Sequence, residues 1–512
     1  MLTRSAIAGP LAGLVLICLS SGADAQLIVS SGPTKGVTCS SGVCTTTTAR
    51  AVLNVQDLQN ELADFDVRLV PGTMSKSIAI NADVFWSSPQ RLTLDSFQGI
   101  AIARSIQVTG TGAITLTTND GGSDGSITYA GKGNIGFLDL SSSLIVDGVA
   151  YTLESSIAGL ASAIAGNSTG HYALAGNYDA SADGSYSASP IPTVFGGTFE
   201  GLHHTISGLK IAVSTTGGNV GLFSSTSSSA AIRDLVLYRI VVDDTGGQGP
   251  TVGGLVGQND GLISNVVVSG SVEAQFGTYI GGLVGHAVFD SQIFNAKSSA
   301  GVFGITAGSL VGNNQGGVIK FSAASGRVTM SPSASSRFGG GLVGNNNGGD
   351  IEQSYATGIV RGPDATVLGG LAGQNADGGI IKACFATGAT KDGMNSDAAG
   401  LVGYNFGQII ESYATGAPKA KRFSRVGGVI GDDFTFGDGS VTTTYWDMTT
   451  SGITNPGQGA GNPSNDPGLT GLTDAQLTSG LPGGFESAIW QQNSSINHGW
   501  PYLTQAPLPP KS

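Results

Sequence analysis

The sequence predicts an all-β chain that folds as a right-handed parallel β-helix with short helical caps or inserts. Three observations lead to this fold class. Glycine supplies 82 of the 512 residues, and only 11% are charged although 40% are hydrophobic. A glycine-framed pentapeptide occurs seven times at spacings of 27 to 32 residues, a period typical of solenoid coils. Between the glycines, short apolar runs alternate with period two, as strands do. Helices are disfavoured, because each interior glycine costs about 1 kcal/mol relative to alanine.

The first element is a predicted secretory signal over residues 1–25. Arg4 precedes an apolar stretch at 6–19, and small residues at 23 and 25 close the segment before Gln26. We therefore expect an exported protein that is extracellular or at the cell surface, with the periplasm as the alternative. The mature chain contains no run of about 20 apolar residues, so we expect no membrane span in it.

Residues 26–75 are predicted to form an N-terminal cap. Residues 55–65 have helical spacing, and an amphipathic helix there would cover the exposed edge of the first coil. Cys39 and Cys44 flank four residues, which suits a small disulfide loop in an oxidising compartment as well as it suits two free thiols. Metal binding by this pair is disfavoured, because no second cysteine or histidine pair completes a zinc set.

Residues 76–190 are predicted to form irregular β-helix coils with a helical insert. Runs such as 78–80, 92–94, 100–102 and 114–116 alternate as strands do but lack the pentapeptide. A helix is expected over residues 153–164.

Residues 191–445 contain the repeats. The central residues of the seven pentapeptides are predicted to form one inward stack: Leu255, Leu283, Leu310, Leu342, Leu371, Leu401 and Val429. Two places after the last glycine, five copies carry an asparagine whose amide can hydrogen-bond the same group one coil away: Asn259, Asn314, Asn346, Asn375 and Asn405. Because Ala287 and Asp433 replace asparagine in the other copies, this ladder should have a gap and an end there. Ligands lining a polar groove are the alternative reading of the asparagines.

An isoleucine follows most of the pentapeptides, and in several copies it opens a longer motif. Ser-Tyr-Ala-Thr-Gly comes after Ile351 and after Ile409. Three other segments accompany this motif: the Gly-Gly-Leu-Val-Gly-x-Asn segments, the entry segment 195–209 and the closing Trp-Pro-Tyr-Leu at 500–503. The order of these motifs resembles that in the GLUG repeats of filamentous-haemagglutinin-like surface proteins, over roughly residues 190–505. The resemblance implies a right-handed β-helix and an adhesin-like binding protein.

The C-terminal region, residues 446–512, is predicted to be a cap with a proline-rich tail and a small helix at 473–481. The sequence departs from secreted adhesins of the family by lacking their Asn-Pro-Asn-Gly signature, so the route beyond the first membrane stays open.

Catalytic motifs are weak, so we expect no enzyme, no cofactor and no metal. A β-helical polysaccharide hydrolase or lyase is the alternative, and its carboxylates would be Asp243 with Asp244 or Asp432 with Asp433. Asp120 and Asp124 could bind calcium, but turns rich in aspartate and glycine need no ion. The net charge of −12 disfavours nucleic acid. The expected partner is a glycan or protein of a host or cell surface.

Three aromatic residues mark the predicted binding strip. Tyr355, Phe385 and Tyr413 lie four places after the repeat isoleucine in consecutive coils. If the chain turns a corner just after the isoleucine, the rings point outward as a strip that could stack sugars, while Cys384 occupies a core slot. Without that corner, the rings form a buried core stack and Cys384 is exposed. The outward strip is preferred because small residues then fill the narrow coil; such rings can also pack under a loop.

Overall fold

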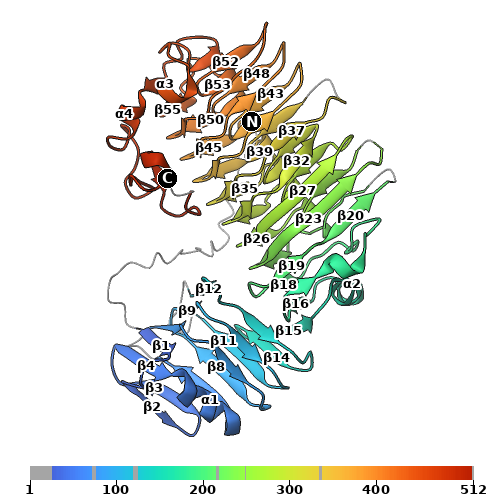
Figure 1. Cartoon of the computed structure of the whole chain (residues 1–512), viewed down its shortest axis with the longest axis vertical. Coiled ribbons are helices and arrows are strands. Elements are labelled where there is room, and N and C mark those ends of the chain that lie inside the picture. Colours follow the sequence, from blue (N-terminus) through green and yellow to red (C-terminus); the bar gives the residue numbers. More distant parts are fainter. Residues whose placement is uncertain are drawn as a thin grey trace, which may run out of the picture. The chain divides into compact units, whose positions relative to one another are not determined.

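The computed structural model describes residues 26–71, 76–118, 125–214, 218–247, 249–333 and 337–509. The predicted signal (1–25) and the proposed calcium ligands Asp120 and Asp124 lie outside these residues. The described chain forms two compact units. Unit 1 comprises the residues up to 155 with 171–176 and 202–204, and unit 2 comprises the rest. Figure 1 colours the chain along the sequence.

Unit 1 is a stack of mostly parallel strands with a capping helix, and two of its strand pairs are antiparallel. Its apolar side chains point inward, as the period-two runs predict. Helix α1 (Val55–Asp64) buries Leu58 and Leu62 and is capped by Asn54, whose side chain accepts the Gln56 N–H. One sheet contains β4 (Arg50–Asn54), β1 (Gln26–Ser30), β6 (Ser77–Ile80), β9 (Gly99–Ile102) and β12 (Ser126–Tyr129). A second contains β7 (Val84–Trp86), β10 (Ile106–Val108) and β13 (Ile135–Phe137). The third contains β2 (Val37–Ser40), β3 (Val43–Thr46), β5 (Val67–Val70), β8 (Arg91–Asp95), β11 (Ala113–Thr117), β14 (Ser143–Val146), β15 (Val149–Glu154) and β16 (His171–Leu174).

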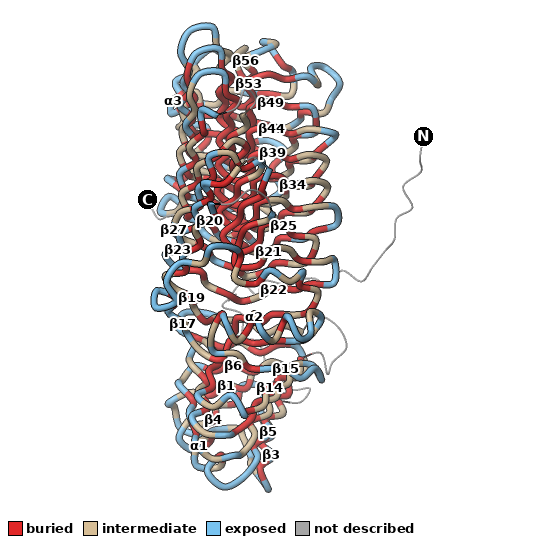
Figure 2. Tube along the Cα trace, turned by 90° about the vertical axis from the view of Figure 1, so that its right-hand side faces the viewer, coloured by how far each residue is buried: buried red, intermediate tan, exposed pale blue. Residues whose placement is uncertain are grey.

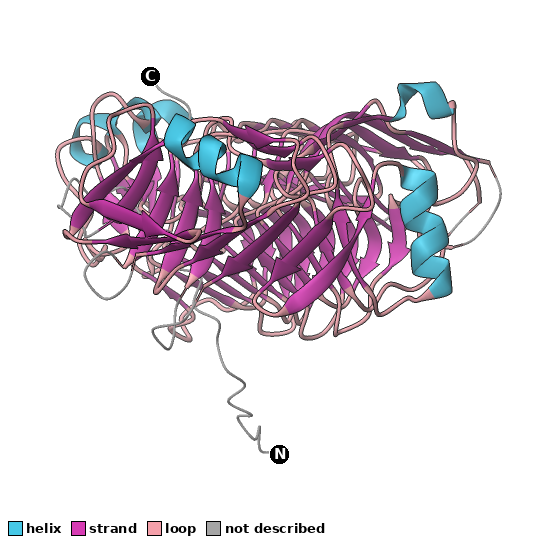
Figure 3. Ribbon diagram, turned by 90° about the horizontal axis from the view of Figure 1, so that it is seen from below, coloured by secondary structure: helices cyan, strands magenta, loops and turns pink. Residues whose placement is uncertain are grey.

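Unit 2 is a parallel β-solenoid, and one coil serves as its pattern. From residue 350 the chain forms β40 (Asp350–Glu352), turns, and forms β41 (Tyr355–Ala356) and β42 (Val360–Arg361). It then forms β43 (Val367–Gly369), bends at the glycine pair, and forms β44 (Ala372–Ala376) before the next coil begins. Each strand pairs in parallel with the same strand of the next coil, so the chain repeats itself in register. Figure 3 shows strands dominating the molecule.

Four sheets result from this stacking, and we name each after the residue or feature that characterises it. The isoleucine sheet contains β18 (Thr198–Glu200), β22 (Ala231–Arg233), β26 (Leu262–Ser264), β30 (Gln292–Phe294), β35 (Val318–Lys320), β40, β45 (Ile380–Lys382), β50 (Gln408–Ile410) and β54 (Val441–Thr442). The ladder sheet contains β21 (Phe223–Ser225), β25 (Val256–Asn259), β29 (Val284–Ala287), β34 (Val311–Gln315), β39 (Val343–Asn347), β44, β49 (Val402–Asn405), β53 (Ile430–Asp433) and β56 (Ala460–Asn462). The glycine sheet contains β24 (Thr251–Gly253), β28 (Tyr279–Gly281), β33 (Thr306–Gly308), β38 (Phe338–Gly340), β43, β48 (Asp397–Ala399) and β52 (Arg425–Gly427).

The ring sheet is the longest and carries the three predicted rings. It contains β17 (Tyr178–Asp179), β19 (Thr205–Ser207), β20 (Lys210–Val213), β23 (Val236–Asp244), β27 (Val267–Ala274), β31 (Lys297–Ser298), β32 (Gly301–Gly304), β36 (Ala323–Ala324), β37 (Val328–Met330), β41, β42, β46 (Phe385–Ala386), β47 (Thr390–Lys391), β51 (Tyr413–Ala414), β55 (Thr444–Asp447) and β57 (Leu469–Leu472).

The predicted inward stack and asparagine ladder are both present. All seven central residues of the pentapeptides have no exposed side-chain surface, and the backbone N–H of each of the first six donates to the carbonyl of the next. The Asn314 side chain donates to Asn346, Asn346 to Asn375, and Asn375 to Asn405, at 2.8 to 3.0 Å. Asn405 donates to Asp433 at 3.0 Å, which ends the ladder as predicted. Figure 2 shows buried residues running the length of this stack.

Helices are short in both units. Helix α2 (Ile157–Gly166) begins four residues later than the expected start at 153, because β15 continues to Glu154, and Ser156 caps it. Near the C-terminus lie α3 (Met448–Ser451) and α4 (Asp474–Leu477), the latter opened by a Thr473 capping box. Strands β58 (Trp490–Gln491) and β59 (Tyr502–Leu503) then pair antiparallel. Among the described residues, no helix is long and apolar enough to cross a membrane.

Candidate binding surface

The corner after the isoleucine decides where the predicted rings point. The residue two places after the repeat isoleucine, or after valine in the last coil, adopts φ between 44° and 55° in eight successive coils: Asp234, Asn265, Asn295, Phe321, Gln353, Ala383, Glu411 and Thr443. This left-handed residue turns the strand direction. After it, Ser354 and Ala356 are fully buried in the coil, and Tyr355 between them points the other way.

Tyr355, Phe385 and Tyr413 stack face to face on the outside of the coils. Their ring centroids are 4.7 and 5.1 Å apart and the planes are tilted by only 6° and 7°. We call these three residues the covered stack, because the rings are nevertheless buried, with 3%, 0% and 0% of their surface exposed.

The C-terminal segment covers this stack. Leu477, Phe485 and Trp490 pack on the rings, and the Tyr413 hydroxyl donates to the Pro501 carbonyl at 2.5 Å. Figure 1 shows this segment, in red, beside β45 and β50. The prediction of an open binding strip is therefore corrected: in this structure the strip is the surface on which the chain's own C-terminal segment packs.

A second surface forms where the pentapeptide bends. The ladder and glycine sheets face each other here, and a Cβ added at Gly257 would lie 2.6 Å from the Val220 backbone nitrogen of the preceding coil. Only glycine leaves room for that approach. Beside the bend, two rows of mostly polar side chains face each other, and we call them the polar seam; six of its fourteen residues, among them Asn313, Asp397 and Asp432, are buried. One row is Thr251, Tyr279, Thr306, Phe338, Val367, Asp397 and Arg425, and the other is Gln258, His286, Asn313, Asn345, Gln374, Tyr404 and Asp432.

The C-terminal end of the seam contains a hydrogen-bonded charge network. Arg425 donates from Nε to Asp397 Oδ1 at 2.5 Å and pairs through Nη1 with Asp432. The Tyr404 hydroxyl donates to Asp397 Oδ2 at 2.9 Å. Burial raises the pKa of Asp397, and the hydrogen bonds from Arg425 and Tyr404 oppose that rise. Burial and the Asp397 carboxylate raise the pKa of Tyr404 to about 12, so its hydroxyl stays a donor.

Beside this network, two phenylalanine rings stack in the open. Phe406 and Phe434 directly follow the ladder residues of adjacent coils; their centroids lie 4.1 Å apart with planes tilted by 6°. They are 41% and 53% exposed. We call this pair the open stack. Tyr404 meets both rings edge-on, so the open stack joins the polar seam. Flat apolar ring faces next to hydrogen-bonding groups are the chemistry that binds sugar rings.

The carboxylates proposed for a hydrolase or lyase do not meet across an open surface. Asp243 is exposed while Asp244 is buried on the opposite face of β23, as strand alternation requires. Asp432 pairs with Arg425, and Asp433 ends the asparagine ladder. Within the part of the chain that the structure describes, no group of three or more histidine, cysteine, aspartate or glutamate side chains could hold a metal.

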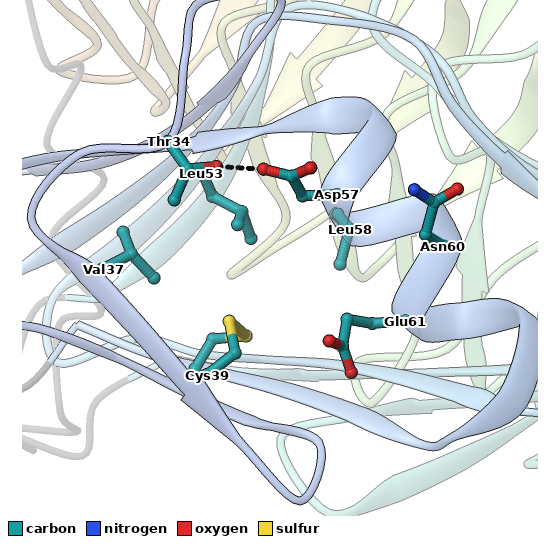
Figure 4. A pocket seen from close by; sticks show the side chains of 9 residues that line it. Thr34, Val37, Cys39, Leu53, Asp57, Leu58, Asn60 and Glu61 are labelled. Atoms are coloured by element: carbon teal, nitrogen blue, oxygen red, sulfur yellow. Dashed lines mark hydrogen bonds between the residues drawn. A yellow bond between two sulfur atoms is a disulfide. The ribbon is translucent and has the colours of Figure 1, made fainter.

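Unit 1 contains a small cavity beside the two cysteines. Cys39 and Cys44 lie opposite each other on β2 and β3 and are joined by a disulfide. The cavity, of about 320 Å³, separates this hairpin from α1, and Figure 4 shows Glu61 across from Cys39. Asp57 on its rim already accepts the Thr34 hydroxyl at 2.5 Å. Cys384, the remaining described cysteine, is fully buried in the slot predicted for it.

The open stack and the seam were missed at the sequence level although a signal was present. The residue between the last pentapeptide glycine and the ladder position can form hydrogen bonds in all seven copies, yet the pentapeptide drew attention only to the core. Phe406 and Phe434 occupy the same place after the ladder residue in consecutive copies, which is the spacing of a stack.

Comparison with known proteins supports the repeat assignment. Residues 248–273 match the model of the GLUG motif. Over 138 residues, 25% of this chain, the sequence is 38% identical to halomucin of Haloquadratum walsbyi (strain DSM 16790 / HBSQ001), of which the chain spans only 1%. Among solved structures, an IgA1 protease is similar over 57% of this chain and 21% of its own, with 18% identity and a TM-score of 0.39. A putative immunoglobulin A1 protease from Bacteroides ovatus is similar over 66% and 87%, with 17% identity and a TM-score of 0.38.

Proposed function

We propose that this GLUG-repeat β-solenoid protein is an exported, adhesin-like binding protein, extracellular or at the cell surface, that holds a glycan of a host or cell surface against the open stack. The single observation that carries the proposal is the exposed, parallel pair Phe406 and Phe434 at the end of a hydrogen-bonding seam. Two exposed apolar rings cost free energy in water, and a bound sugar face would remove that surface from water.

The surroundings of the open stack suit hydrogen bonding to hydroxyl groups. Tyr404 and the carboxylates of Asp397 and Asp432 lie in one network with Arg425. Asp397 and Asp432 are buried and hold Tyr404 and the half-exposed Arg425 in place, so a ligand would meet prearranged polar groups of these two residues and would lose less entropy on binding. Export is supported by the N-terminal signal pattern and by the disulfide, which persists in oxidising compartments.

A glycan array tests the proposal with a matched pair of variants. Phe406→Ala/Phe434→Ala should abolish the binding that the wild-type protein gives, at an unchanged melting temperature. The control is Phe289→Ala/Phe423→Ala, which removes two phenylalanines that are 63% and 84% exposed in other loops. If the control loses binding equally, or if the stack variant keeps it, the open stack is not the site.

The same experiment separates binding from catalysis. A bound glycan that is recovered at its original length supports a binding protein. A glycan that is shortened, as measured by size-exclusion chromatography, would favour the hydrolase or lyase alternative instead.

A further inference from the structure

Three basic side chains lie one above another on the ring sheet. Arg361, Lys391 and Lys419 occupy the same position in consecutive coils: Arg361 pairs with Lys391, and Lys391 pairs with Lys419. Adjacent coils are spaced by about 4.8 Å. All three side chains are exposed, whereas the residue before each of them, Val360, Thr390 or Pro418, is buried. The three cations therefore point away from the coil in one row, which we call the basic ladder.

The basic ladder has no ionic partner among the described residues. The ion pairs there involve other cations, such as Lys320 with Glu352 at 2.7 Å and Arg425 with two aspartates. Lys421 and Arg422, on the loop after Lys419, extend the patch and are also exposed. The patch stands out because the whole chain carries a net charge of −12.

The carboxyl groups in the neighbouring loops do not neutralise this patch. Asp392 follows Lys391 but is buried, and its Oδ1 accepts the Thr366 hydroxyl. Burial raises the pKa of Asp392 to about 7, so it contributes less than a full charge near neutral pH. Asp364 is exposed and accepts the Met394 N–H at 2.8 Å. Five cations against one exposed carboxylate leave a local positive field. Repulsion between these like charges makes the patch unfavourable unless a counterion binds to it.

We propose that the basic ladder binds a linear polyanionic glycan, one that carries carboxylate or sulfate groups along its length and runs parallel to the stacking direction of the coils. A row of cations at the coil repeat suits a polymer with regularly placed charges better than a single small anion. Nucleic acid is the less favoured polyanion, because one of its strands carries a phosphate about every 3.4 Å, whereas the cations of the basic ladder recur about every 4.8 Å. The basic ladder shares no residue with the open stack, and binding of a polyanion to the ladder does not depend on the open stack.

The test measures binding of the full mature chain to four immobilised polymers: polygalacturonate, dextran sulfate, uncharged dextran and single-stranded DNA. The wild-type protein should bind a charged glycan, should lose that binding as NaCl is raised, and should not bind dextran. Arg361→Gln/Lys391→Gln/Lys419→Gln should weaken binding by at least roughly tenfold. The control, Lys35→Gln/Arg50→Gln/Arg104→Gln, removes three exposed cations of unit 1 and should leave it unchanged.

Each outcome decides the proposal. Preference for polygalacturonate identifies a carboxylated ligand, preference for dextran sulfate identifies a sulfated one, and equal binding of both supports the shared chemistry. Tighter binding of DNA, no binding of either charged glycan, or equal loss in the control variant would overturn the proposal. Phe406→Ala/Phe434→Ala should keep polyanion binding, so failure here and failure of the proposed glycan site are distinguishable.

Discussion

The covered stack and the open stack are built by the same rule and have opposite fates. Each places aromatic rings at one repeat position in adjacent coils, so that the rings lie nearly parallel at 4.1 to 5.1 Å. Tyr355, Phe385 and Tyr413 lie under the C-terminal segment, whereas Phe406 and Phe434 remain about half exposed to solvent. In a solenoid, register alone stacks side chains, and only a segment from elsewhere in the chain decides whether the stack becomes core or surface.

The largest difference should appear when one phenylalanine is removed from each stack. Phe385→Ala leaves a cavity under the C-terminal segment and should cost about 3–5 kcal/mol of unfolding free energy. Phe434→Ala deletes the same atoms from a half-exposed site and should cost less than about 1 kcal/mol. Chemical denaturation of the two variants measures the contrast, and equal losses would mean that the C-terminal segment does not pack on the covered stack in solution.

A smaller and more local effect is expected from the other side of the same contact. Trp490 is fully buried against Phe385 and Tyr413, with ring centroids 6.1 and 5.8 Å away. Trp490→Ala should release the segment from about residue 473 onward while the coils keep their register, because strand pairing does not depend on it. Limited proteolysis followed by mass spectrometry should find new cleavages in that segment alone. Cleavage spread evenly through unit 2 would show that the segment holds the coils together.

Features that recur at the repeat spacing were predicted correctly from the sequence, whereas contacts between segments without that spacing were not. The leucine stack and the asparagine ladder, with its end at Asp433, follow from spacing, because in-register coils bring equal positions together. The covering of Tyr413 could not be predicted, since Trp490 and Pro501 lie more than two coils further along the chain and have no repeat spacing to it. From the sequence, the left-handed corner could be stated only as one of two alternatives, because no single residue type marks it. Gln353, Ala383 and Glu411 all adopt this conformation.

Acid–base chemistry should act on neither stack. Glu200 and Asp234 are buried at the N-terminal end of the isoleucine sheet and its first corner. Burial raises the pKa of Glu200 to about 8, with the Asp234 carboxylate adding and Arg233 opposing, and burial raises the pKa of Asp234 to about 7. The folded chain thus keeps protons that the unfolded chain has already lost. The stability that protonated Glu200 and Asp234 contribute is complete below the unfolded-state pKa of about 4. It is lost as the pH rises through their folded-state pKa values of about 7 to 8.

The melting temperature should therefore fall by a few degrees between about pH 5 and about pH 8.5. Glu200→Gln should flatten part of this slope, because Asp234 and Asp392, whose pKa values burial raises to about 7, lose their protons in the same pH window. The effect of Phe385→Ala on the melting temperature should, by contrast, be the same at both pH values. The same holds for the smaller effect of Phe434→Ala. A slope that Glu200→Gln leaves unchanged would place the titrating groups elsewhere.

The smallest effect is expected directly beneath the covered stack, at Cys384. In neighbouring coils the same slot holds serine, whose hydroxyl donates to the carbonyl two residues back: Ser354 to Glu352 at 2.8 Å and Ser412 to Ile410 at 2.9 Å. The Cys384 thiol takes that role toward Lys382 at 3.2 Å, and its own N–H donates to the Ser412 hydroxyl. Cys384→Ser should therefore change the unfolding free energy by less than about 1 kcal/mol, since serine replaces a weak donor by a stronger one at similar size. Cys384→Val is the matched control, because it has no donor and adds a branch in a filled slot, and it should cost about 1–3 kcal/mol. If serine destabilises the chain as much as valine does, the slot selects for the size and polarisability of sulfur, and the hydrogen-bond relay between coils contributes nothing to stability.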